Sequence, residues 1–343
     1  MFKCAIIGVS GSRAKGHAEA YAHIRRGQLA AISSRQPAAL ARFGDEFGVA
    51  QRYTDYREMF AVEKPDLVHV NTPPDVRLEI FQAADEAGIP ALIVEKPLAI
   101  QGEDLAAMRD FAAHSSVKIA VNHQLHFHPR RARLQQLVRD GVLGDVRFID
   151  AGARMNMAYQ GTHTLQAIGA FNPAAQAVST FAQIGGADGL AATPRRHFAP
   201  DRTLATIAYD NDVQALLRCG VNAPHVDPAR PVHQHKRIAV YGTRGSLEWT
   251  MWSWRMDIGG QTVRGEHDYA AEDILGQAAL TEAMFDWLDD DRKVHPLNLT
   301  RSMDDFALLL AIYTSGLTRA PVALPHTPPP ELIARLRAGL AGE

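Results

Sequence analysis

The chain has 343 residues. A single hydrophobic core usually supports a shorter chain, so the length predicts two domains. Its 36 lysine and arginine residues nearly balance its 38 aspartate and glutamate residues, and this balance argues against nucleic acid or an anionic membrane as the main partner. Two cysteines exclude a disulfide framework and no apolar stretch reaches the length of a membrane span, so we expect a cytoplasmic protein.

The N-terminal segment predicts a strand, a glycine-containing loop and a helix. Residues 3–8 read as a strand with an apolar run after Lys3, and helical spacing covers residues 18–26. Glycines let a backbone turn tightly and approach a pyrophosphate, which then lies on the amide groups of the helix N-terminus. The loop departs from G-x-G-x-x-G, because Ser10 replaces the second glycine and the loop is longer than the pattern before Gly16, so an ordinary turn would also explain it. The residues that we expect to contact a dinucleotide are Gly8, Ser10, Gly11, Ser12, Arg13, Gly16 and His17.

The second predicted strand, residues 28–33, ends in Ser33, Ser34 and Arg35. An acid at this place usually holds the ribose 2′-hydroxyl of NAD. A hydroxyl followed by a guanidinium suits a 2′-phosphate instead, because arginine makes forked, charge-assisted contacts with phosphate oxygens. These residues therefore favour NADP(H) over NAD(H) as the cofactor. An ordinary turn before the helix that begins at Pro37 is the alternative explanation.

The alternation of helices and strands continues to residue 121. We expect helices at 37–47, 56–60, 75–88 and 102–113, and strands at 66–71, 91–95 and 117–121. Repeated units of this kind imply a parallel, doubly wound sheet whose loops at 71–74 and 95–97 lie on the same edge. The first of these loops makes Asn71, Thr72 and Pro73 candidates for cofactor contact.

The run from Ala91 to Val94 is aliphatic throughout, as in a strand buried on both faces, and Glu95, Lys96 and Pro97 follow it. In an open parallel sheet, the carboxyl ends of the strands border the crevice where ligands bind. Proline fixes its own φ and permits a cis bond, which would hold Lys96 at an angle unlike that of a regular strand. We therefore expect Lys96 to take part in chemistry, and a salt bridge at the strand end is the alternative.

Four stretches in order along the chain carry a resemblance. They are the loop that ends in Gly16 and His17, the strand and loop at 70–74, the Glu-Lys-Pro element at 94–98, and the stretch at 241–247. Together they resemble the glucose-fructose oxidoreductase and inositol dehydrogenase family (Gfo/Idh/MocA). The resemblance implies an NAD(P)-dependent oxidoreductase that transfers a hydride between nicotinamide and a hydroxyl-bearing carbon of a sugar, cyclitol or related polyol. It also implies cofactor contacts at Glu95, Lys96 and Pro97.

The regular alternation of predicted strands and helices stops after residue 121, which indicates a second domain. We expect a dinucleotide-binding α/β Rossmann domain at 1–122 and an α+β domain for substrate binding and oligomerisation at 123–343. Strand candidates dominate from residue 177, and helices follow, which suggests a large, open, mostly antiparallel sheet with one face covered by helices. The other face is available for a subunit interface, which similar proteins use, so we expect a homodimer or homotetramer.

The segment after residue 121 is rich in histidine. His123, His126 and His128 fit neither one helix face nor a zinc pattern, so we expect no metal there. The resemblance implies that this segment contributes Gln124 and His126 to the substrate pocket. Three later histidines, whose role the sequence leaves open, are His225, His233 and His235.

The last strand candidate, residues 246–254, contains three tryptophans. Strand alternation puts Trp252 and Trp254 on one face, where they would serve either an interface or the core, and Trp249 lies on the same candidate.

A histidine near the start of a predicted helix is the second candidate catalytic residue. The resemblance implies that His163 accepts the substrate's proton, while Lys96 holds and polarises the reacting oxygen. The family pattern places aspartates four residues before and three after this histidine, where the chain has Tyr159 and Gln166. The implied substrate pocket comprises Lys96, Gln124, His126, Tyr159 and His163. Because both aspartates are missing, a catalytically silent protein that binds NADP and a sugar as a regulatory sensor is the rival interpretation.

Overall fold

The computed structural model describes residues 1–187, 198–230 and 234–341. The chain forms two compact units, and each is discontinuous in sequence. The first unit comprises residues 1–99, 106–128 and 270–303, and the second comprises residues 100–105, 129–269 and 304–343. The domain boundary expected after residue 122 stays a prediction. Within the described ranges, no helix combines the length and the apolar composition that a membrane crossing requires.

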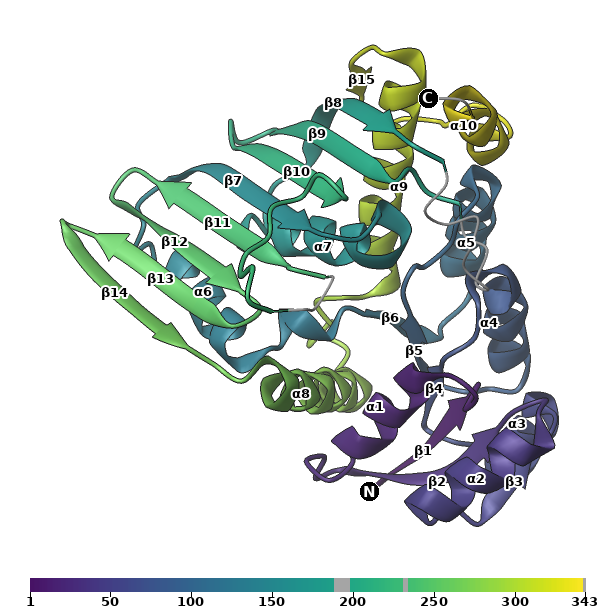
Figure 1. Cartoon of the computed structure of the whole chain (residues 1–343). Helices are drawn as coiled ribbons and strands as arrows, with labels where there is room; N and C mark the ends of the chain where they lie inside the picture. The colour runs from purple at the N-terminus through teal and green to yellow at the C-terminus, as the bar shows by residue number, and fades with distance from the viewer. Residues whose placement is uncertain (188–197, 231–233, 342–343) are drawn as a thin grey trace. The chain divides into compact units, whose positions relative to one another are not determined.

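The described residues of the first unit contain a six-stranded sheet in the order β3-β2-β1-β4-β5-β6, and its neighbouring strands are parallel. Helices follow the strands in alternation along the chain, so the expected doubly wound Rossmann sheet is confirmed (Figure 1). The strands are β1 Phe2–Ile7, β2 Gly27–Ser33, β3 Gln51–Tyr53, β4 Leu67–Val70, β5 Ala91–Glu95 and β6 Lys118–Asn122, and the first helices are α1 Ser12–Ala20, α2 Pro37–Phe47, α3 Tyr56–Glu63 and α4 Arg77–Glu86.

Helix α1 lies earlier in the chain than its sequence predicts. It begins directly after Gly11, whose extended backbone forms the N-cap, and it ends at Ala20. The residues after Ala20 form tighter hydrogen bonds to the third preceding carbonyl, such as Tyr21 N to Ala18 O at 3.1 Å, so the helix does not reach residue 26. Most of the expected glycine loop is therefore the first turn of this helix.

Strand β5 is buried along its whole length and lies between β4 and β6, as expected for a central strand of a doubly wound sheet. Val94 is in register with Val70 of β4 and Val121 of β6. The carboxyl ends of these three strands therefore lie side by side, as the sequence predicts. The bond between Lys96 and Pro97 is cis.

The described part of the second unit contains a nine-stranded sheet in the order β14-β13-β12-β11-β7-β10-β9-β8-β15 (Figure 1). Only the pairing of β7 with β10 is parallel, so the mostly antiparallel sheet is confirmed for the described residues. The strands are β7 Val146–Ala153, β8 Ala177–Gly185, β9 Arg202–Tyr209, β10 Gln214–Gly220, β11 Arg237–Gly242, β12 Gly245–Thr250, β13 Ser253–Ile258, β14 Gln261–Glu266 and β15 Val322–Ala323.

The expected single strand at 246–254 is wrong, because the chain turns between Thr250 and Ser253. The Thr250 hydroxyl accepts hydrogen bonds from the backbone N–H groups of Trp252 and Ser253, which closes the turn. Trp252 therefore lies in the turn and does not alternate with Trp254. Instead Trp249 of β12 is in register with Trp254 of β13, and Trp249 is buried in the core.

The two faces of the second sheet differ. One face packs against helices, as the Ser315 hydroxyl of α9 shows by accepting a hydrogen bond from Ala182 N of β8 at 2.9 Å. The other face carries alternate residues of each strand, among them Asp150, which binds both Arg218 and Arg237 at 2.7 Å. We call this second surface the open face, and its exposed apolar side chains are Phe148, Phe181, Leu204 and Tyr241.

The remaining helices are α5 Gly102–His114, α6 Pro129–Arg139, α7 Thr162–Phe171, α8 Tyr269–Asp289, α9 Leu299–Thr318 and α10 Leu332–Leu340.

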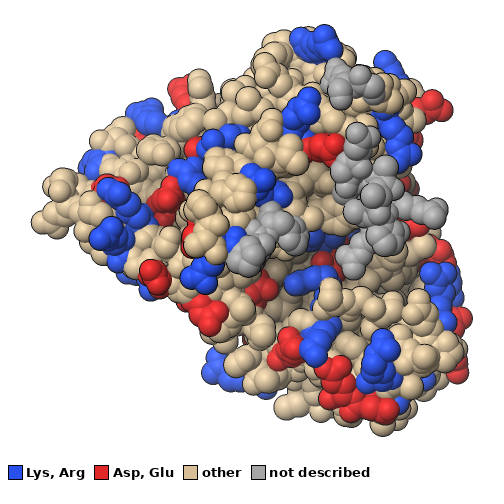
Figure 2. All heavy atoms as spheres, in the orientation of Figure 1, with Lys and Arg blue, Asp and Glu red and all other residues tan. Residues whose placement is uncertain are grey.

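Surface charge is mixed. On the face that Figure 2 shows, lysine and arginine are interspersed with aspartate and glutamate, and neither sign forms one continuous area.

Candidate functional site

The glycine loop lies at the carboxyl edge of the first sheet. Gly8 follows β1 with φ of +88°, and a Cβ at this position would lie 2.8 Å from the carbonyl oxygen of Asn71. Only glycine therefore lets the loop approach the end of β4 so closely. Ser10 and Ser12 are exposed, and within the described chain no side chain caps the start of α1. The backbone N–H groups of this helix start are suited to an anion such as a pyrophosphate.

The end of β4 carries polar atoms that a ligand could satisfy. The side-chain amide nitrogen and oxygen of Asn71 and the hydroxyl of Thr72 are buried and have no hydrogen-bond partner within the described residues. Buried polar groups in folded proteins are normally paired, so these three atoms fit a bound dinucleotide. The cofactor role expected for Asn71, Thr72 and Pro73 is consistent with this geometry and stays a prediction.

Arg77 is a residue that sequence reasoning missed. It is fully buried at the start of α4, and its guanidinium donates to the carbonyl oxygens of Thr72 at 2.8 Å and Pro97 at 2.6 Å, and also to that of Glu95. Arg77 therefore ties the loop after β4 to the Glu-Lys-Pro element. Burial lowers the pKa of Arg77 to about 10, which leaves it cationic at neutral pH. An arginine preceding the apolar face of a helix gives no local signal of this role.

The end of β2 lies beside the glycine loop, because Ser33 O accepts a hydrogen bond from Gly8 N at 2.8 Å. Ser34 is buried, and its hydroxyl accepts from Gln36 N at 3.3 Å, so this side chain supports the turn before α2. Arg35 is exposed. The residues at this strand end thus fit a phosphate through Arg35, whereas the hydroxyl of Ser34 already has a structural role.

His17 and Glu95, both expected to contact the cofactor, are buried and bind each other. The His17 Nε2 lies 3.1 Å from the Glu95 Oε1, and Arg13 Nε donates to the same oxygen at 3.3 Å. Lys96 follows Glu95 directly, at the edge that also carries Gly8 and Asn71. The first unit therefore gathers the expected cofactor loop and the expected catalytic lysine on one edge of its sheet.

The second candidate catalytic residue lies in the second unit. His163 is buried at the second position of α7, one turn before Gln166. Tyr159 belongs to the wide turn Met157–Gly161 that precedes α7, and its backbone N–H donates to Asn156 Oδ1 at 3.2 Å. The Gln166 Oε1 accepts a hydrogen bond from Arg131 Nη2 at 3.1 Å. A neutral amide thus stands where the family pattern has an aspartate, and it faces a guanidinium.

Arg131 is the other functional neighbour that the sequence did not indicate. It is fully buried on α6, and its guanidinium lies 5.8 Å from the ring centre of Trp249. Burial lowers the pKa of Arg131 to about 9. In the sequence it belongs to a basic cluster on an ordinary helix, which looks like a solvated face.

The remaining candidate residues are divided between the units. Gln124 and His126 belong to the first unit, where Gln124 Nε2 donates to Asp273 Oδ1 at 3.0 Å and His126 packs edge-on against Phe127. Their expected contact with substrate stays a prediction. The rings of His225 and His235 lie 4.8 Å apart, and His233 lies outside the described residues. Within those residues, no group of three or more His, Cys, Asp or Glu side chains could hold a metal ion.

Comparison with known proteins finds a family match for the N-terminal part of the chain. Residues 2–123 match the model of the oxidoreductase family with an NAD-binding Rossmann fold, named GFO_IDH_MocA. The match covers the N-terminal third of the chain, and this part resembles the Gfo/Idh/MocA family, as its motifs suggest.

Parts of the chain are also similar to two curated dehydrogenases. D-xylose 1-dehydrogenase (NADP(+)) 2 of Haloferax volcanii is 30% identical over 32% of this chain and 34% of its own. Levoglucosan dehydrogenase of Pseudarthrobacter phenanthrenivorans is 25% identical over 63% of each chain. The matched stretch thus spans about a third of the length of the first relative and less than two thirds of the second.

A solved structure shares the fold over almost the whole chain. An oxidoreductase from Agrobacterium radiobacter, in complex with NAD+, L-tartaric acid and magnesium, aligns with a TM-score of 0.80 and 18% identity. The alignment covers 94% of this chain and 98% of that one. At this identity the likeness supports the fold alone.

Proposed function

We propose that the protein is an NAD(P)-dependent oxidoreductase that acts on a CH–OH group of a sugar, cyclitol or related polyol. The observation that carries the proposal is the single sheet edge that holds the Gly8 loop, the unpartnered polar atoms of Asn71 and Thr72, and Lys96. Steady-state assays of a polyol panel with NADP+ and NAD+ test it. Reduction of the nicotinamide with at least one polyol is expected.

Two side chains have distinct roles in the proposed oxidation. Bound nicotinamide supplies the hydride acceptor. Lys96 holds the substrate oxygen and polarises it, and His163 accepts the hydroxyl proton as the hydride leaves the carbon. The hydride, with the C–H bonding electrons, would go to the nicotinamide, the O–H bonding electrons would form the carbonyl π bond, and the proton would go to the imidazole, so the oxidation balances.

We further propose that NADP(H) is preferred, because Ser34 and Arg35 stand where NAD-binding folds usually have an acid. Arg35→Ala is expected to weaken NADP(H) binding by roughly ten- to a hundred-fold, the range of a bidentate charged contact, with little change for NAD(H). Fluorescence titration of both cofactors measures this. Arg42→Ala, which removes another exposed arginine from α2, is the matched control. Equal affinities for the two cofactors in the unaltered protein would refute the preference.

The rival function, a silent sensor, draws on Tyr159 and Gln166, which replace two carboxylates of the family pattern. A sensor would bind NADP(H) and a sugar without turnover. Calorimetric binding of a sugar combined with no nicotinamide reduction in the polyol panel would favour it.

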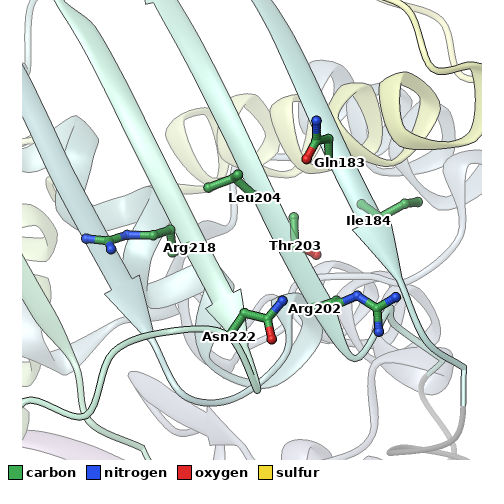
Figure 3. Close-up of a pocket in the computed structure, with 7 residues that line it drawn as sticks. All are labelled: Gln183, Ile184, Arg202, Thr203, Leu204, Arg218 and Asn222. Atoms are coloured by element: carbon green, nitrogen blue, oxygen red, sulfur yellow. The ribbon is translucent and has the colours of Figure 1, made fainter.

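We infer that copies of the chain associate through the open face. Its apolar side chains lie between charged residues, and one of them, Leu204, lines a hollow of about 410 Å³ on β8–β10 (Figure 3). The residues around the hollow are Gln183, Ile184, Arg202, Thr203, Leu204, Arg218 and Asn222. A second copy would remove this apolar surface from water, which favours association.

Phe148→Asp is expected to convert the assembly to monomers, because the new carboxylate would be desolvated in the interface while it costs the exposed monomer little. Light scattering of the eluted protein measures the mass. Val62→Asp, which changes an exposed apolar residue of α3 in the other unit, should leave the mass unchanged. A monomeric parent protein would contradict the inference.

A further inference from the structure

One oxygen of Glu95 gathers three hydrogen-bond donors. Besides Arg13 and His17, Asn122 of β6 donates its Nδ2 to Oε1 at 2.6 Å. Gln277 of α8 then receives bonds from both Asn122 at 3.0 Å and Arg13 at 3.3 Å. Glu95 itself is only 7% exposed. A buried carboxylate thus connects the start of α1, the end of β5 and the end of β6, and the residue after it is Lys96.

Glu95 is an anion in this network. Burial alone would raise the pKa of its carboxyl, but Arg13, His17 and Lys96 together hold that pKa well below its usual range. Burial lowers the pKa of His17, so the imidazole is neutral and donates through Nε2–H. The neighbouring His69 ring, 4.6 Å from that of His17, is also kept neutral by burial, which holds its pKa well below the ordinary value.

The cations that face the carboxylate are therefore Arg13, Lys96 and Arg77. Arg77 donates to the backbone oxygen of Glu95, so both the side chain and the main chain of this residue are held from outside β5. A residue fixed in this way fixes the direction in which the next residue leaves the strand.

We propose that Glu95 is a positioning residue for Lys96, and that His17 and Arg13 couple it to the glycine loop. The proposal deepens the proposed function and rests on the role given there to Lys96. The carboxylate stabilises the lysine ammonium by its charge, and its three hydrogen bonds hold the main chain before the lysine. Through Arg13 and His17, a ligand that orders the glycine loop also orders the residue before Lys96.

Charge and geometry can be separated, because all three donors bind the same oxygen. Glu95→Gln keeps an acceptor at Oε1 and removes the negative charge, whereas Glu95→Ala removes both. The neutral amine is the form that reacts with acylating reagents. Without the nearby carboxylate, the ammonium of Lys96 should lose its proton at a pH about one unit or more lower, so a larger fraction of the amine is neutral. In Glu95→Gln, a reagent should therefore acylate Lys96 about tenfold faster at a fixed pH near neutrality. Glu95→Ala should in addition weaken NADP(H) binding about tenfold, since the tether to the glycine loop is lost.

The second arm tests the coupling through His17. His17→Gln can present an amide N–H at the place of Nε2, whereas His17→Leu keeps the bulk and removes the donor. His17→Leu should weaken NADP(H) binding about fivefold, and His17→Gln should stay within about twofold of the parent. Glu46→Gln is the control, because it removes an exposed carboxylate of α2, paired with Lys15, by the same chemical change.

Mass spectrometry of Lys96 acylation across pH measures the electrostatic effect of Glu95. Fluorescence titration of NADP(H) measures the coupling through His17. Neither measurement requires turnover. Parent-like acylation in Glu95→Gln would overturn the electrostatic role. Equal cofactor affinities in the two His17 variants would overturn the coupling. If both arms give the expected results and no polyol is oxidised, the positioning role holds and the proposed function fails instead.

Discussion

Lys96→Ala is expected to lower turnover by several orders of magnitude while the melting temperature and the cofactor affinity stay close to those of the parent. The reason is that Lys96 lies at the carboxyl edge of the sheet, where in the proposed reaction the substrate oxygen would develop charge during hydride transfer, and an ammonium there would stabilise that charge. Steady-state kinetics with NADP+, thermal denaturation and fluorescence titration give the three values.

Two further variants sharpen this test. Lys96→Arg keeps a positive charge but presents a planar fork, so it should recover only a small part of the rate if the compact ammonium must reach one oxygen. Lys293→Ala removes an exposed lysine of the same unit and should change nothing. An unfolded Lys96→Ala, or one with normal turnover, would instead support a salt bridge with a purely structural role.

The sequence predicts the parts of the site that short local motifs at strand ends mark. Gly8, Asn71 and Lys96 each end a strand, and parallel strands place their carboxyl ends on one edge, so local patterns were sufficient to group them. The order of elements in the first sheet follows from the same alternation. Proline chemistry permits the cis bond before Pro97, but the sequence alone did not predict it.

The residues that sequence reasoning missed come from far along the chain. Gln277 lies 155 residues after Asn122, and Arg131 lies 35 residues before Gln166. No local period marks such contacts, because they arise only when tertiary packing brings separate elements together. The turn at Trp252 was missed for a different reason: the Thr250 hydroxyl closes it without any glycine, proline or asparagine.

The role expected for His17 and Glu95 shows a limit of motif reasoning. Their positions in a cofactor loop and a strand end suggest contact with the dinucleotide, and the motif alone cannot tell which way a side chain turns. Both side chains are buried and meet each other, which favours support of the site over direct contact.

The surroundings of His163 determine how its proton transfer should depend on pH. A histidine base acts through its neutral imidazole, and a carboxylate partner would stabilise the imidazolium. Here the residue one turn along α7 is Gln166, and it binds the Arg131 guanidinium at 3.1 Å. Arg131, with its pKa near 9, stays cationic throughout the range in which histidine titrates. A nearby cation favours the neutral imidazole.

We therefore expect the oxidation rate to rise with pH through a single ionisation at or below about 6.5, the ordinary value for histidine. His163→Asn should abolish this dependence and lower the rate roughly a hundred- to ten-thousand-fold, the usual contribution of a general base. Gln166→Glu should move the ionisation to higher pH, because its carboxylate both stabilises the imidazolium and neutralises the field of Arg131. Rate profiles from pH 5 to 9 for the parent and both variants measure these effects. A profile unchanged by His163→Asn would assign the proton acceptor to another group, with Lys96 the next candidate.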